Sequence, residues 1–137
     1  MPLPAPEPGL VVRYDYLWFR EAQQGRRQGK DRPACLVAAS DNAARPRYVV
    51  LLPIIHSPPA SDTIGIAIPQ AVKKAIGLDD EPSWVIVSEY NIGEWPNAGL
   101  SQIPERPGAY SYGFLPPKLF ASVRQGFLDL AREKRAR

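Results

Sequence analysis

Residues 49–59 read Val-Val-Leu-Leu-Pro-Ile-Ile-His-Ser-Pro-Pro, and this stretch decides the fold that we expect. Together with Arg47 and Tyr48 it forms the most apolar part of the chain, which predicts a central strand over residues 47–55. The pair Pro58-Pro59 ends that strand, because proline has no amide proton to donate to a β-ladder. His56, the only histidine among 137 residues, therefore follows directly on the strand.

A second informative stretch, residues 29–37, reads Gly-Lys-Asp-Arg-Pro-Ala-Cys-Leu-Val. Here a basic loop that ends in Arg32 leads into a short buried strand, predicted over residues 33–39. If this strand lies beside residues 47–55, Arg32 and His56 face each other across one small cleft. A fixed positive charge opposite a titratable imidazole suits a phosphodiester ligand.

The rest of the chain predicts short strands, two helices and a single domain over residues 10–137. In residues 10–18, Val12, Tyr14, Tyr16 and Trp18 alternate onto one face. These elements indicate a small, strongly bent sheet or barrel with helices packed outside it. The remaining predictions are strands over 63–68 and 83–88, helices over 69–76 and 116–135, a polar loop over 19–31, a turn over 40–46 and a loop-rich stretch over 89–112 with room for one short strand.

Composition limits the cellular setting and the partners. Four prolines in residues 1–9 predict an extended lead-in without the basic and apolar regions of a signal peptide. One cysteine without an intrachain partner fits a reducing cytosol, and no apolar run approaches the ~18 residues that span a bilayer. The net charge is +3, with basic ends around an acidic centre, which permits a polyanionic ligand without requiring one.

Four side chains are candidates for chemistry. Arg32 is either a surface arginine beside a proline turn or an anchor that holds two phosphate oxygens at once, and His56 is either structural or a general acid or base near neutral pH. Ser57 either hydrogen-bonds to a phosphate or caps a turn. Glu89, at the end of a strand, is either a proton carrier or a solvent-facing charge.

Other chemistries lack their motifs. The sequence has no glycine-rich phosphate loop, no Cys-x-x-Cys and no His-Glu-x-x-His, so we expect no metal and no cofactor. We interpret Asp79-Asp80-Glu81 as a solvated turn, since it lacks the glycine and the spaced ligands of a calcium loop. The aromatic groups in residues 14–19 and 110–114 belong to the core or stack on bases.

The order of these motifs resembles the MazF/PemK toxins of bacterial type II toxin–antitoxin modules. The resemblance covers about residues 9–132. It lies in Gly9-Leu-Val-Val, the basic loop, Arg32-Pro-Ala-Cys-Leu-Val, Val49-Val-Leu-Leu-Pro-Ile, Gly77-Leu and Tyr110-Ser-Tyr-Gly-Phe-Leu-Pro-Pro-Lys-Leu.

This resemblance implies a small SH3-like barrel with a C-terminal amphipathic helix, a homodimer and a neutralising antitoxin. It implies a cytoplasmic, metal-independent endoribonuclease that cleaves single-stranded RNA through attack of the ribose 2′-hydroxyl on the phosphate. Arg32 falls on the family's catalytic arginine. In the family the preceding loop flanks the RNA groove. The resemblance therefore implies that the basic residues of this loop bind RNA, namely Arg20, Arg26, Arg27 and Lys30.

One departure from the family pattern matters. The family has Pro-Ile-Thr where this chain has Pro53-Ile54-Ile55, and isoleucine lacks the hydroxyl that helps to bind the phosphate. Ser57 or His56 supplies the missing polar group, or the toxin is weakened. Alternating side chains favour Ser57, which falls on the same side as Ile55 in a regular strand. A growth inhibitor that binds DNA gyrase, as CcdB-type proteins do, and an inactive family member are the alternatives.

Overall fold

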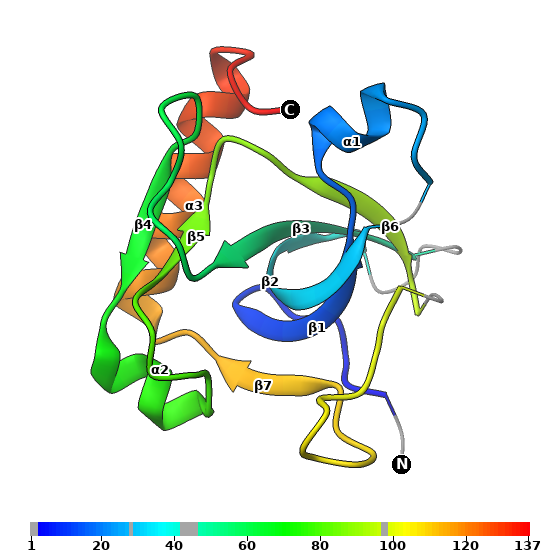
Figure 1. Cartoon of the computed structure of the whole chain (residues 1–137), viewed down its shortest axis with the longest axis vertical. Coiled ribbons are helices and arrows are strands. Elements are labelled where there is room, and N and C mark those ends of the chain that lie inside the picture. Colours follow the sequence, from blue (N-terminus) through cyan, green and yellow to red (C-terminus); the bar gives the residue numbers. More distant parts are fainter. Residues whose placement is uncertain (1–2, 28, 42–46, 97–98) are drawn as a thin grey trace.

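The computed structural model describes residues 3–27, 29–41, 47–96 and 99–137. Its fold is mainly β with added helices, as predicted (Figure 1). The elements in chain order are β1 (Leu10–Tyr16), α1 (Phe19–Gln23), β2 (Lys30–Ala39), β3 (Arg47–Ile55), β4 (Gly65–Ile68), α2 (Gln70–Ile76), β5 (Ser83–Ile86), β6 (Asn91–Trp95), β7 (Ser111–Phe114) and α3 (Pro117–Arg132).

The strands pair in the order β4-β5-β3-β2-β1-β7, and β6 pairs with β3 alongside β5. All of these pairs are antiparallel. Among the described residues the path of strands does not return to its start, so the sheet is open and is not the closed barrel that we expected. Helix α2 lies between the end of β4 and β7, where Ile76 packs against Gly113 (Figure 1).

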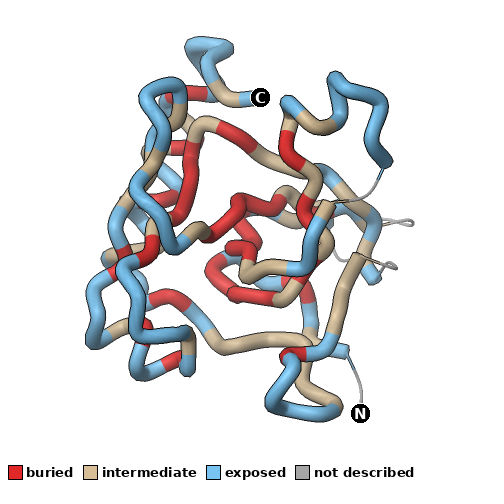
Figure 2. Tube along the Cα trace, in the orientation of Figure 1, coloured by how far each residue is buried: buried red, intermediate tan, exposed pale blue. Residues whose placement is uncertain are grey.

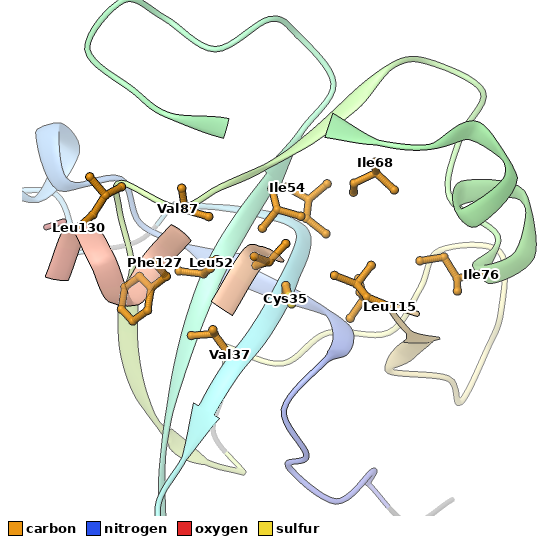
Figure 3. Close-up of a cluster of buried hydrophobic side chains, with 13 residues drawn as sticks. Cys35, Val37, Leu52, Ile54, Ile68, Ile76, Val87, Leu115, Phe127 and Leu130 are labelled. Carbon is orange, nitrogen blue, oxygen red and sulfur yellow. The ribbon is translucent and has the colours of Figure 1, made fainter. Parts of the chain in front are cut away.

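One face of the sheet is covered by α3, and the main core lies between them (Figure 3). Val123, Phe127 and Leu130 are buried and Phe120 packs at the margin, which confirms the apolar stripe predicted from their spacing. Strand β2 contributes Cys35, whose burial raises the pKa of its thiol to about 12. No helix in the described part of the chain is long and apolar enough to cross a membrane.

The other face of the sheet carries a second core. Val12, Tyr14, Tyr16 and Trp18 all belong to it, which confirms the alternation predicted for the first strand. Both faces of β2 and β3 are thus covered, and Figure 2 shows buried residues concentrated in these central strands. Because β3 is central, its uniform hydrophobicity revealed its bounds, and the predicted range 47–55 is confirmed.

Several predicted boundaries were wrong in polar segments. The expected loop over 19–31 contains α1 and the start of β2. Helix α1 begins where the Glu21 carboxylate accepts a hydrogen bond from the Trp18 amide at 3.3 Å. Strand β2 begins three residues earlier than predicted, since Lys30 pairs with Tyr16. Strand β7 was not anticipated, and residues 42–46 of the predicted turn lie outside the described residues.

The segment between β1 and β2 is fastened at two points. The Asn91 side chain accepts from the Leu17 amide at 3.0 Å and donates to the Leu17 carbonyl at 2.8 Å. The Gly29 amide donates to the Asp15 carboxylate at 2.8 Å. Gly29 packs so closely that a Cβ atom there would lie 1.8 Å from the Tyr16 carbonyl oxygen. These contacts fix the place at which the basic segment re-enters the sheet.

Replacing Gly29 should therefore destabilise the fold. We expect Gly29→Ala to lower the free energy of unfolding by roughly 2–3 kcal/mol, because the new methyl group collides with backbone that cannot move aside. Gly25→Ala is the matched control. A Cβ there meets nothing within 4 Å, and only its φ of +86° adds a cost of about 1 kcal/mol. Equal losses for both variants in urea unfolding would contradict this account.

Candidate functional site

A cleft opens where β3 changes partner. Strands β2 and β3 pair as far as Ala34 opposite Pro53, after which Ile54 and Ile55 pair with β5 instead. The first residues of β2 are left beside the end of β3 without a ladder between them. The space there measures about 890 Å³.

Five of the eight predicted site residues line this cleft. They are Arg20, Lys30, Arg32, His56 and Ser57. Ile55 lines it too. Continuing the pairing of β2 with β3 sets Ile55 across from Arg32, so the two side chains share one face of the sheet.

Arg32 and Arg20 are held on a single aromatic ring. The Arg20 Cζ lies 5.0 Å and the Arg32 Cζ 5.3 Å from the centroid of the Trp18 ring, so each guanidinium makes a cation–π contact. Trp18 itself is buried. The charge of Arg20 acts on Arg32, and both residues line the cleft.

The Arg32 side chain is half-buried and has no ion pair within the described part of the chain. Its Nε atom is buried without a hydrogen-bond partner there. Burial lowers the pKa of Arg32, Glu21 opposes that effect, and the charge of Arg20 adds to it. The guanidinium stays charged at working pH values, since its ordinary pKa is above 12. The Nε–H group of Arg32 is therefore a buried donor without an acceptor among the described residues.

His56 and Ser57, which follow β3 directly, line the same cleft as exposed side chains. The His56 Nε2 atom lies 3.9 Å from a Glu81 carboxylate oxygen. With Asp79 these residues bring their ligand atoms within 4.8 Å of one another. The Lys73 ammonium already neutralises Asp79 at 2.6 Å, so the three side chains do not form a free set of ligands for a cation.

Lys73 organises the loop that carries these acids. Its side chain is fully buried in α2, and its Nζ also donates to the Glu81 carbonyl oxygen. Although burial of Asp79 opposes ionisation, the hydrogen bond and charge of Lys73 lower the pKa of Asp79 below its ordinary value. The predicted solvated turn is exposed, yet a buried lysine holds it beside His56. The signal available in the sequence was the position of Lys73, three residues before Ile76 on the inner face of the helix.

The other three predicted site residues lie outside the lining of the cleft. Glu89 is 8% exposed, and its carboxylate accepts a hydrogen bond from the Phe19 amide at 3.2 Å, which anchors the start of α1. Arg26 forms an ion pair with Glu21, and Arg27 is an exposed side chain away from the cleft. Of the four basic residues predicted to bind RNA, Arg20 and Lys30 therefore line the cleft, whereas the other two do not.

Several polar residues of the cleft were not predicted from the sequence, among them two arginines and a tyrosine. Arg13, Arg106 and Tyr112 line it from three separate parts of the chain. Only the Tyr112 segment carried a signal, because its aromatic cluster was a candidate for base stacking. Arg106 lies in a proline-rich loop, where nothing in the pattern indicates its direction.

The sequence matches no protein-family model and none of the curated proteins. The site is therefore interpreted from its own residues. It offers four guanidinium groups, an imidazole and three hydroxyl groups around one open cleft. Such a set can bind a phosphodiester and transfer a proton.

Burial raises the pKa of Glu89, although the Phe19 amide acts against it. The folded state therefore binds a proton more tightly than the unfolded chain, and stability should fall as the pH rises from about 4.3, the ordinary glutamate pKa, towards neutrality. We expect Glu89→Gln to remove this fall while its amide oxygen still accepts from Phe19. The advantage in Tm of the variant over the wild type should then grow with pH. A constant difference in Tm from pH 4 to pH 7 would show that Glu89 is not the titrating group.

Proposed function

We propose that this chain is a MazF/PemK-like toxin, an endoribonuclease that cleaves single-stranded RNA in the cleft between β2 and β3. One observation carries the proposal: Arg20 and Arg32 share the Trp18 ring and face the cleft without forming an ion pair in the described residues. The carboxylates of Glu21 and Glu89 offset part of the repulsion between these two like charges, and the positive charge that remains attracts an anion to the cleft. A phosphodiester at the cleft wall supplies that anion.

The resemblance supports the same assignment. Its catalytic arginine is Arg32, which stands at the cleft, and the fold is mainly β with a terminal helix. The SH3-like barrel of that family would correspond here to the curved sheet, with α2 in the gap between β4 and β7. A neutralising antitoxin, a second copy of the chain and a cytoplasmic setting are the further expectations of this proposal.

The proposed reaction uses groups of the cleft alone. The ribose 2′-oxygen attacks phosphorus and the bond from phosphorus to the 5′-oxygen breaks, which leaves a 2′,3′-cyclic phosphate and a 5′-hydroxyl. His56 accepts the proton of the 2′-hydroxyl and returns a proton to the leaving 5′-oxygen. Arg32, with Arg20, stabilises the negative charge that grows on the non-bridging oxygens.

Ile55 leaves one role to be filled. It lies on the same face as Arg32, where the family places a threonine hydroxyl. Strand β3 ends at Ile55, and both following residues line the cleft, so Ser57 and His56 each reach it. We assign the phosphate-binding hydroxyl to Ser57, because His56 carries the proton in this scheme.

Ile55 is also the observation that favours a second candidate. A toxin without the family hydroxyl is a weak nuclease, and a CcdB-like growth inhibitor that binds DNA gyrase needs no such group. Growth arrest without RNA cleavage, relieved by a gyrase mutation, would support that function. Normal growth during expression would indicate an inactive family member.

The decisive assay measures cleavage of a long single-stranded RNA in the presence of EDTA. The wild type should cut it and yield 5′-hydroxyl ends. Arg32→Ala should lose about 100-fold or more in rate, the usual effect of removing a group that stabilises developing charge. The mechanism would be rejected if the two proteins cleave the RNA equally well and only after metal is added.

Arg20 and Arg27 offer a matched comparison within one segment. Arg20→Ala removes a charge at the cleft and should slow cleavage about tenfold, since a charge-assisted hydrogen bond contributes on the order of 1.5–3 kcal/mol. Arg27→Ala removes the same charge from an exposed side chain outside the cleft and should stay within about twofold of the wild type. Equal losses for the two variants would mean that only the overall charge matters.

A further inference from the structure

The cleft carries a second group of cations around an aromatic ring. The Arg106 Cζ lies 5.7 Å from the centroid of the Tyr112 ring, and the Arg13 Nη1 atom donates to the Tyr112 hydroxyl at 3.3 Å. All three residues line the cleft. Neither arginine forms an ion pair with a carboxylate in the described ranges. The proposed reaction uses none of them.

This group lies on the other face of the sheet from Arg32. Tyr14 pairs directly with Arg32, so these two residues share a face, and Arg13, one residue earlier, points to the opposite one. The first residues of β2 therefore have one cationic and aromatic group on each side. A ligand held by both groups has to extend past the start of this strand.

The two arginines of this group are held in place by contacts with the backbone, and Tyr112 is partly buried against the main core. Arg13 donates through Nη2 to the Asp31 carbonyl oxygen at 3.4 Å, and Arg106 donates through Nη2 to the Gly77 carbonyl oxygen at 3.2 Å. Gly77 has a φ of +76°, and a Cβ atom there would lie 1.7 Å from the Arg106 Nη2. Only Nη2 of Arg106 is engaged in these contacts, so the rest of its guanidinium is available to a ligand.

We propose that Tyr112, with Arg13 and Arg106, forms a second nucleotide position of the cleft, which stacks a base of single-stranded RNA and binds an adjoining phosphate. This inference rests on the proposed function and names a further part of its substrate. Stacking on aromatic rings and guanidinium planes is how proteins hold unpaired RNA bases.

Charge also favours a polyanion at this position. Five cationic side chains line the cleft against three carboxylates, and Lys73 neutralises one of the three. The cations are Arg13, Arg20, Lys30, Arg32 and Arg106, and the carboxylates are Asp31, Asp79 and Glu105. An extended nucleotide chain meets positive charge at both of its contact points, whereas a single phosphate would use only one of them.

The test measures binding of ligands that cannot be cleaved. The probe is a fluorescent 2′-O-methyl RNA hexanucleotide of degenerate sequence, compared with the same backbone made fully abasic. Tyr112→Leu should weaken binding of the hexanucleotide about tenfold, the lower part of the range for one stacked base. It should leave binding of the abasic backbone within about twofold. Tyr112→Phe, which keeps the ring, should retain most of the affinity.

Tyr110→Leu is the matched control. It removes a tyrosine two residues away that does not line the cleft, and it should bind both ligands like the wild type. Should Tyr112→Leu fail to fold, Arg106→Gln is the second variant, with an expected loss of three- to tenfold for the hexanucleotide. Equal affinities of Tyr112→Leu and Tyr110→Leu, or no binding by the wild type, would overturn the second position.

The two proposals fail separately in these experiments. A chain that binds the hexanucleotide through Tyr112 and cleaves no RNA keeps the second position and loses the nuclease. If Arg32→Ala abolishes RNA cleavage but Tyr112→Leu binds the hexanucleotide as tightly as the wild type, the nuclease proposal stands and the second position is rejected.

Discussion

The site depends on one change of partner in the sheet. Strand β3 pairs with β2 up to Pro53 and with β5 from Ile54 onward. Proline has no amide proton, so Pro53 is a natural point for a ladder to end. If β3 continued beside β2, the residue opposite Arg32 would close the gap with backbone hydrogen bonds. Because the two strands separate, the first residues of β2 keep their pairing with β1 but have no partner on the β3 side, where they line a cleft together with the residues after β3.

Groups that never face the cleft position much of what does. Buried Lys73 draws the acidic loop towards α2 and so places carboxylates beside His56. Glu89 accepts the first amide of α1, next to the ring on which Arg20 and Arg32 are held. Burial of a charged lysine and of a carboxylate is unfavourable unless each is paired or hydrogen-bonded, and both are. The geometry of the cleft thus depends on buried polar groups that do not line it and that have a structural role.

The sequence predicted those parts of the fold that have a regular pattern of apolar residues. The bounds of β3, the single face of Val12 to Trp18 and the left-handed end of α2 at Gly77 all followed from local pattern and chain stereochemistry. The polar start of β2 was missed, because Lys30 is a strand residue only through its pairing with Tyr16. Arg13 and Tyr112 are 99 residues apart, and no local pattern indicates such a contact. The open sheet likewise depends on how distant strand edges meet.

In the MazF/PemK-like toxin that we propose, Ile55 stands where the family has a threonine, on the face that it shares with Arg32. An apolar side chain offers the guanidinium no hydrogen bond, and a less polar setting strengthens the attraction between Arg32 and an anion. The same change removes one donor to that anion. A ligand that reached only this face would gain charge and lose a contact. Under the proposed function, a longer nucleotide chain recovers the lost contact elsewhere, at Ser57 or at the cationic group around Tyr112, and an extended substrate is then favoured over a small one.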